Sequence, residues 1–199
     1  KKDTKMTKQV DEMIRHSAVE QVDLAIQNID HHQERIQQTA LKATVDSFEG
    51  SPGKAIKYSS VAPEVVYNKL VHRLQSSDSA TTAERCLVAL VWISRDYGHL
   101  PYQHASLFRQ LVESDNSQIQ ANSILILGNL SLEGKQEYRK CAAAIKPAVK
   151  DPDAEVREAA AAALGNIPCE PSLKYLNHLT DDPDPNVRQT AVGELEVFN

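Results

Sequence analysis

The side chains that could do chemistry do not form a recognisable catalytic or metal-binding set. His31 and His32 are adjacent, so on a helix they point about 100° apart and do not share one metal ion as an i, i+4 pair can. His99 and His104 lie in one short segment, where a solvated or hydrogen-bonded pair is a better interpretation than a metal site. The chain has no GxSxG nucleophile motif. We expect no catalytic residue and no metal ligand.

Cysteine and glycine positions give no further chemistry. Cys86, Cys141 and Cys169 are odd in number and show no CxxC spacing, which favours neutral thiols in a reducing compartment over disulfides. Gly50 and Gly53 are not followed by the Lys and Ser or Thr of a phosphate-binding loop. We expect no bound cofactor.

Composition and charge limit the classes of partner. The 199 residues include 22 Lys and Arg against 27 Asp and Glu, a formal net charge of −5, and 41% are apolar. Net negative charge disfavours non-specific nucleic-acid binding, which needs clustered cations. No run approaches the roughly 20 apolar residues of a membrane span. We expect a cytoplasmic protein with no nucleic-acid partner and no membrane span, although a chain that begins with Lys leaves open a removed N-terminal signal.

The elements that would position any site are indicated by internal similarity. Residues 151–157 and 182–188 align with an offset of 31, and residues 127–130 repeat as 164–167 with an offset of 37. A repeat of this length holds two helices and short turns. The predicted first helices cover residues 19–29, 63–74, 106–112, 135–149 and 171–179.

The second helix of each repeat is predicted by hydrophobic spacing. In residues 156–167 the apolar side chains recur at i, i+3, i+4, i+7 and i+8, which is one buried stripe. Asp153 and Asn116 are good N-cap residues for such helices. A weaker first copy places Ile36 at the position of Val156. No alternating strand pattern competes.

We therefore predict an all-α fold, a right-handed α-α superhelix of about five helix pairs in a single domain over residues 1–199. The predicted repeats cover residues 14–48, 63–93, 105–130, 135–167 and 171–199, with loops at 49–62 and 94–104. No polar capping helix follows the last predicted helix, so we expect the full-length protein to continue, or this end to dock on another chain.

The pattern D-x-[DP]-x-V-R-x-x-A-x-x-A-L-G resembles the HEAT repeat family of helical solenoids, in the short form also found in phycocyanobilin lyase subunits. The match is clearest over residues 151–165, good over 182–195 and degraded over 114–128. In such repeats the Asp caps the second helix, and the Arg pairs with an acidic residue or carbonyl of the next unit. The residues to which this scaffold role extends are Asp153, Val156, Arg157, Asp184, Val187 and Arg188.

Five alanines at 159–163 have two interpretations. Alanine permits close helix approach with high helix propensity, which favours tight packing between repeats. Alternatively, Ala161 and Ala162 lie off the buried stripe and provide a smooth floor for a partner.

Solenoids present extended binding surfaces, so we expect a non-enzymatic protein-interaction scaffold or adaptor whose partner is another protein. The candidate partner-binding residues are Leu87, Val91, Trp92, Tyr97, Tyr102, Ile124 and Leu125. The competing interpretation of the apolar residues on second helices is burial inside the array. The alternative function is a subunit of a bilin lyase or isomerase-like enzyme, which the family resemblance implies, although no residue identifies a tetrapyrrole site.

Overall fold

The computed structural model describes residues 20–30, 34–49, 61–97, 100–132 and 134–198. The chain forms two compact units, residues 1–92 and residues 93–199, and the boundary falls inside one helix. The predicted single domain stays a prediction. None of the described helices is both long enough and apolar enough to cross a lipid bilayer.

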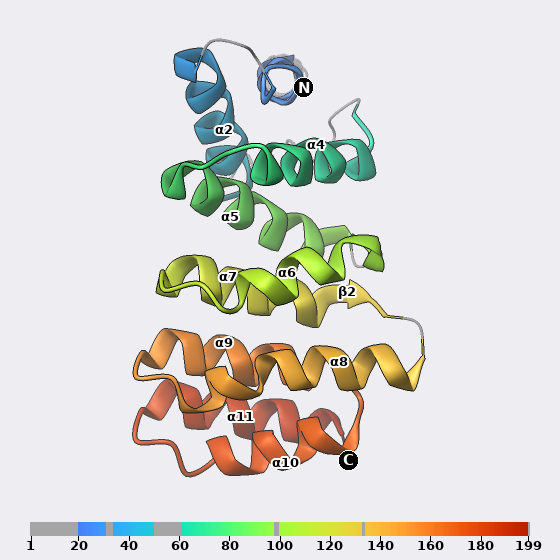
Figure 1. Cartoon of the computed structure of the whole chain (residues 1–199), viewed down its shortest axis with the longest axis vertical. Coiled ribbons are helices and arrows are strands. Elements are labelled where there is room, and N and C mark those ends of the chain that lie inside the picture. The colour runs from blue at the N-terminus through green and yellow to red at the C-terminus, as the bar shows by residue number, and fades with distance from the viewer. Residues whose placement is uncertain (1–19, 31–33, 50–60, 98–99, 133, 199) are drawn as a thin grey trace, which may run out of the picture. The chain divides into compact units, whose positions relative to one another are not determined.

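The regular elements described in the N-terminal unit are all helices (Figure 1). Its elements are a helical segment at 20–27, α2 (Glu34–Glu49), α4 (Pro63–Gln75) and most of α5 (Ala80–Tyr97). Proline is favoured at the first position of α4, because the N–H it lacks would have no partner inside the helix. Residues 50–60, most of the predicted loop, lie outside the described residues.

The C-terminal unit arranges its helices in two layers. Its elements are β1 (Leu100–Pro101), η1 (Tyr102–His104), α6 (Ala105–Leu111), α7 (Ser117–Asn129), β2 (Leu130–Ser131), α8 (Lys135–Ile145), η2 (Lys146–Lys150), α9 (Ala154–Gly165), α10 (Glu170–Leu179) and α11 (Pro185–Val197). The first helices α6, α8 and α10 pack in sequence, and so do the second helices, with α9 between α7 and α11 (Figure 1). The predicted all-α repeat fold is confirmed.

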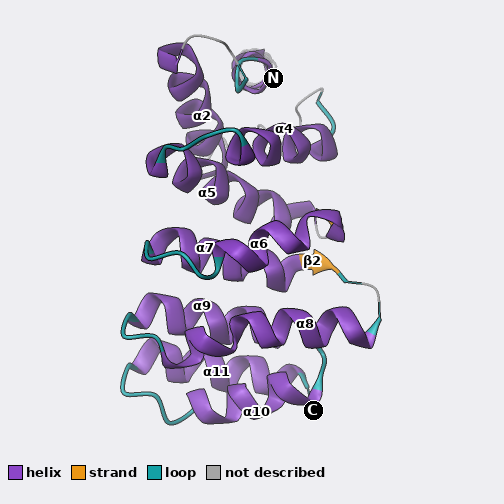
Figure 2. Ribbon diagram, in the orientation of Figure 1, coloured by secondary structure: helices purple, strands orange, loops and turns teal. Residues whose placement is uncertain are grey.

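The predicted loop at 94–104 is wrong. Helix α5 continues to Tyr97 because Ile93 and Ser94 are buried, and β1 and η1 follow. Strand β1 pairs in parallel with β2, with Leu100 opposite Leu130; Figure 2 shows β2 at the end of α7. Strands of two residues carry no alternating pattern, so sequence periodicity did not reveal them.

Helix α8 is shorter than the predicted first helix at 135–149. The α-helix ends at Ile145 and the chain continues as the 3-10 helix η2. Pro147 explains the change, because proline lacks the N–H that an α-helix interior requires.

The second helices begin at side-chain caps. The Asp153 carboxylate accepts a hydrogen bond from the Glu155 N–H, and Asp184 accepts from the N–H groups of Asn186 and Val187. Asn116 caps α7 in the same way. These caps satisfy backbone donors that have no partner within the helix.

The core follows the predicted stripe. The stripe residues of α9 are all buried: Val156, Ala159, Ala160, Ala163 and Leu164, together with Ile167 just after the helix. Ile36, which the repeat alignment places at the position of Val156, does not share its burial: Ile36 is 39% exposed, whereas Val156 is 0% exposed. No neighbouring helix among the described residues covers Ile36, and it lines a pocket instead.

Close packing between second helices explains Gly128, whereas Gly165 faces a flexible side chain that could move. A Cβ atom at Gly128 would lie 2.6 Å from the Ala163 Cα atom, and one at Gly165 would overlap the Glu194 side chain. Ala161 is fully buried and Ala162 is half-buried. The alanines of α9 therefore serve tight packing, and the interpretation of Ala161 as a floor for a partner is wrong.

Candidate partner-binding site

An arginine joins the last two repeats. Arg157 Nε donates to Asp182 Oδ2 at 2.8 Å, and Nη2 donates to Oδ1 at 2.9 Å. The Arg157 Nη1 atom also donates to the carbonyls of Asp151 and Pro152. The hydrogen bond from Arg157 lowers the pKa of the Asp182 carboxyl. Each of these contacts joins a helix to a turn, so the pair is part of the framework of the repeats.

Arg188 repeats part of this arrangement one unit later. Its Nη1 atom donates to the carbonyl oxygens of Asp182 at 2.7 Å and Pro183 at 2.9 Å. Arg157 therefore binds the turn of its own repeat and the turn of the next repeat, whereas these two hydrogen bonds of Arg188 stay within its own turn. Asp182 was not among the predicted scaffold residues, although its alignment with Asp151 in the repeat motif could have identified it.

A row of polar side chains runs across the ends of three second helices. The Asn166 amide donates to Asn129 Oδ1 at 3.2 Å, and the Asn129 amide donates to Ser94 Oγ at 3.0 Å. Asn166 is exposed and Asn129 is half-buried. The LGN sequences of two repeats thus place a glycine for close packing next to an asparagine that connects neighbouring helices.

The predicted partner-binding residues differ in exposure. Three of them are buried within the chain: Leu87, Val91 and Ile124. This corrects the expectation that these three side chains face a partner, because burial within the chain leaves them little surface to offer. Trp92 and Leu125 are half-buried, and Tyr102 is 44% exposed. The side chain of Tyr97 lies outside the described residues.

The two buried cysteines, Cys86 and Cys141, are poor nucleophiles. Burial raises the pKa of the Cys86 thiol to about 12 and raises the pKa of Cys141 as well. Because the thiolate is the reactive form, both thiols are inert near neutral pH. Cys169 is half-buried, with its sulfur 3.2 Å from Ser172 Oγ. Within the described ranges, no group of three or more His, Cys, Asp or Glu side chains is placed to hold a metal ion.

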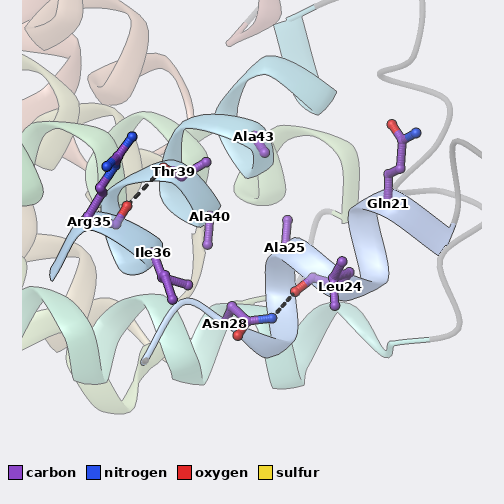
Figure 3. A pocket seen from close by; sticks show the side chains of 9 residues that line it. All are labelled: Gln21, Leu24, Ala25, Asn28, Arg35, Ile36, Thr39, Ala40 and Ala43. Atoms are coloured by element: carbon purple, nitrogen blue, oxygen red, sulfur yellow. Dashed lines mark hydrogen bonds between the residues drawn. The ribbon is translucent and has the colours of Figure 1, made fainter. Parts of the chain in front are cut away.

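An apolar pocket of about 380 Å³ lies between the 20–27 segment and α2 (Figure 3). Its apolar lining consists of Leu24, Ala25, Ile36, Ala40 and Ala43. Leu24 is 61% exposed and Ile36 is 39% exposed. Hydrophobic contact with a partner would remove this apolar surface from water.

The polar groups around this pocket are largely committed to their own helices. The Asn28 amide donates to the Leu24 carbonyl at 2.8 Å, and the Thr39 hydroxyl donates to the Arg35 carbonyl at 2.8 Å. The pocket, which we call the Leu24–Ile36 pocket, therefore offers apolar contact more than hydrogen bonding. Leu24 lies off the buried stripe that contains Val22, Ala25 and Ile26. A leucine outside such a stripe is the sequence feature that could have indicated this pocket.

Comparison with known proteins agrees with this fold. Residues 104–196 match the family model for HEAT repeats, which confirms the resemblance over that part of the chain. A search of curated proteins finds no match.

Solved structures of engineered repeat proteins are similar to the chain. An engineered protein has a TM-score of 0.66 at 19% identity, covering 88% of this chain and 78% of that one. A designed armadillo repeat protein has a TM-score of 0.66 at 16% identity, covering 96% and 87%. Another, solved in complex with the peptide (KR)4, has a TM-score of 0.67 at 16% identity, covering 96% and 86%. At these identities the likeness shows the helical repeat fold alone.

Proposed function

We propose that this chain is a non-enzymatic scaffold that binds another protein, and that the Leu24–Ile36 pocket is a main contact. The observation that carries the proposal is the exposure of Leu24 and Ile36, at 61% and 39%, on the two walls of one pocket. Burying apolar surface contributes roughly 25 cal/mol per Å². Large exposed apolar residues that line a common hollow are typical of interaction sites.

The shape of the pocket favours a helix as the contacting element of the partner. Both walls are helical, and five of the lining residues are apolar (Figure 3). An amphipathic helix presents apolar side chains at i, i+3, i+4 and i+7, which suits a groove of this kind. Gln21 and Arg35 supply polar groups at the edge. We therefore assign the pocket to an amphipathic helix of the partner.

Two further observations support protein binding. A similar designed armadillo repeat protein was solved in complex with a peptide, so a fold of this type accommodates a peptide chain. Trp92, Leu125 and Tyr102 keep partly exposed side chains and remain candidate contacts in this proposal, Trp and Tyr being common in interface hot spots.

The test compares two charge insertions in the N-terminal unit. The double variant Leu24→Glu, Ile36→Glu places carboxylates in the pocket, and Val65→Glu places one on α4 at an exposed position that does not line it. Proteins captured from native extract by each form are quantified by mass spectrometry. The purified partner is then titrated calorimetrically against each form, with circular dichroism as the check of folding.

We expect the double variant Leu24→Glu, Ile36→Glu to bind the partner at least about 30-fold more weakly, a loss of roughly 2 kcal/mol of binding free energy. Val65→Glu should stay within about twofold, because isolated surface changes have small effects. Equal binding by all three proteins would contradict the assignment of the pocket. A purified chain that binds no captured protein by titration would contradict the scaffold function itself.

A further inference from the structure

A second pocket, in the C-terminal unit, has a different chemical character. It has a volume of about 580 Å³ and lies between η2 and α10. This volume is within the range of about 300–1,000 Å³ that is typical of ligand sites. The residues that define its character are Lys146, Lys150, Lys174, Tyr175, His178 and Val149. We call it the lysine pocket.

Cations stand on both walls of the lysine pocket. Lys146 and Lys150 come from η2, and Lys174 and His178 lie four residues apart on one face of α10. No carboxylate is among the residues that line it. The three lysines are exposed and form no ion pair within the described part of the chain. A chain with a net charge of −5 thus concentrates unpaired positive charge at this place.

Several other basic residues of the structure pair with carboxylates. Lys69 Nζ lies 3.2 Å from Asp30 Oδ2, and Lys140 Nζ lies 2.7 Å from Glu137 Oε1. The same Glu137 also meets Arg109. No carboxylate lines the lysine pocket, so its positive charge is available to a ligand. Like charges repel one another, and a bound anion would reduce this repulsion.

The floor of the lysine pocket is apolar. Val149 is 4% exposed, and Tyr175 is half-buried on α10. A ligand that fits both parts carries negative charge at its edges and an apolar group between them. Carboxylate side chains beside an aliphatic or aromatic one have this combination.

The geometry points to an acidic segment of the protein partner, with an apolar residue at its centre, as the occupant of the lysine pocket; this inference rests on the proposed function. A compact phosphate is favoured where helix N-termini supply N–H groups, but Lys174 lies in the middle of α10 and His178 lies in its last turn. Nucleic acid is disfavoured by the negative charge of the chain as a whole.

The test uses the full chain and a fluorescein-labelled octapeptide in which Glu and Leu alternate. Binding is followed by fluorescence anisotropy, with a second peptide that has Gln at every Glu position. The variant Lys150→Gln, Lys174→Gln removes two pocket charges. Its matched control, Lys135→Gln, Arg139→Gln, removes two charges from exposed positions of α8 that do not line the pocket.

We expect the acidic peptide to bind and the Gln peptide to bind at least about tenfold more weakly, since the cations contribute most of the attraction. The variant Lys150→Gln, Lys174→Gln should bind the acidic peptide about five- to tenfold more weakly than the unmodified chain. The matched control should lose less than about twofold in affinity. Raising NaCl from about 0.05 to 0.5 M should weaken binding further, because salt screens exposed charges.

Three results would overturn the inference. They are equal binding of both peptides, equal effects of the two double variants, and stronger competition by inorganic phosphate or single-stranded RNA than by unlabelled acidic peptide at equal charge. The Leu24→Glu, Ile36→Glu variant separates this inference from the proposed function, because it should retain the acidic peptide. If the lysine-pocket variant bound the acidic peptide as well as the unmodified chain, this inference would fail, and the proposed role of the Leu24–Ile36 pocket would not be affected.

Discussion

Arg157 and Asp182 form a two-point ion pair between the last two repeats, with Nε–Oδ2 and Nη2–Oδ1 distances of 2.8 and 2.9 Å. Their side chains are only 11% and 5% exposed. A paired geometry of this kind is stronger and more directional than a single contact. Because both groups are largely removed from water, loss of one partner leaves the other charge without compensation.

Asp182→Asn should therefore destabilise the chain by about 2–4 kcal/mol, because Arg157 keeps its charge and loses its carboxylate. The measurement is the free energy of unfolding in urea. Asp181→Asn is the matched control, since Asp181 is exposed and its loss should change stability by less than about 0.5 kcal/mol. Equal stability losses in the two variants would show that the ion pair does not hold the repeats together.

The same pair should make stability depend on pH. Hydrogen bonding from Arg157 lowers the pKa of Asp182 in the folded chain, so the unfolded chain binds the proton more tightly. The stabilising contribution is complete above the unfolded pKa of about 3.9 and is lost as pH falls through the lower folded pKa. The stability gap between the unmodified chain and Asp182→Asn should shrink below about pH 4. Urea unfolding from neutral pH down to the acid limit measures this gap, and a constant gap would exclude the linkage.

Gly128 and Gly193 should respond to alanine in opposite directions. A Cβ at Gly128 would meet the Ala163 backbone at 2.6 Å, whereas nothing lies within 4 Å of one at Gly193. Gly128→Ala should cost about 1–3 kcal/mol through overpacking, and Gly193→Ala should gain about 0.5–1 kcal/mol from helix propensity. Thermal unfolding of both variants provides the comparison. A stabilised Gly128→Ala would mean that α7 and α9 separate easily.

The buried stripe and the caps could be predicted because both depend on local sequence. Val156 and Asp153 occupy positions that helix periodicity and cap chemistry define without knowledge of the neighbours. The burial of Ile124 could not be predicted this way, because it depends on how many sides of α7 are covered. Exposed Ile36 shows the opposite error, since its position in the repeat predicted a neighbour that the described structure does not place over it.

The two pockets depend on tertiary packing and were not predicted. Lys150 and Lys174 are far apart in the sequence, and only the packing of η2 against α10 brings them to one hollow. Leu24 and Ile36 lie on separate helical segments whose crossing angle no local pattern specifies. Sequence patterns identify the framework residues of such repeats, whereas the candidate sites arise between elements.

Asn129 should contribute more to stability than Asn166. Asn129 donates to Ser94 and accepts from Asn166, so Asn129→Ala breaks two side-chain hydrogen bonds, and Asn166→Ala breaks one at an exposed site. We expect losses of about 1–2 kcal/mol and about 0.5 kcal/mol respectively. Urea unfolding of the two single variants and the double variant measures the coupling. Strictly additive losses would contradict a connected row.

The three cysteines should react with iodoacetamide at different rates. Cys86 is 0% exposed with a pKa of about 12, so at pH 8 only about one thiol in ten thousand is ionised. Cys141 is also buried with a raised pKa, whereas Cys169 is half-buried. Mass spectrometry of the folded chain should find Cys169 labelled first, and all three labelled at similar rates once urea has unfolded the chain. Labelling of Cys86 as fast as Cys169 in the folded chain would place the Cys86 thiol at the surface and contradict the packing of α5.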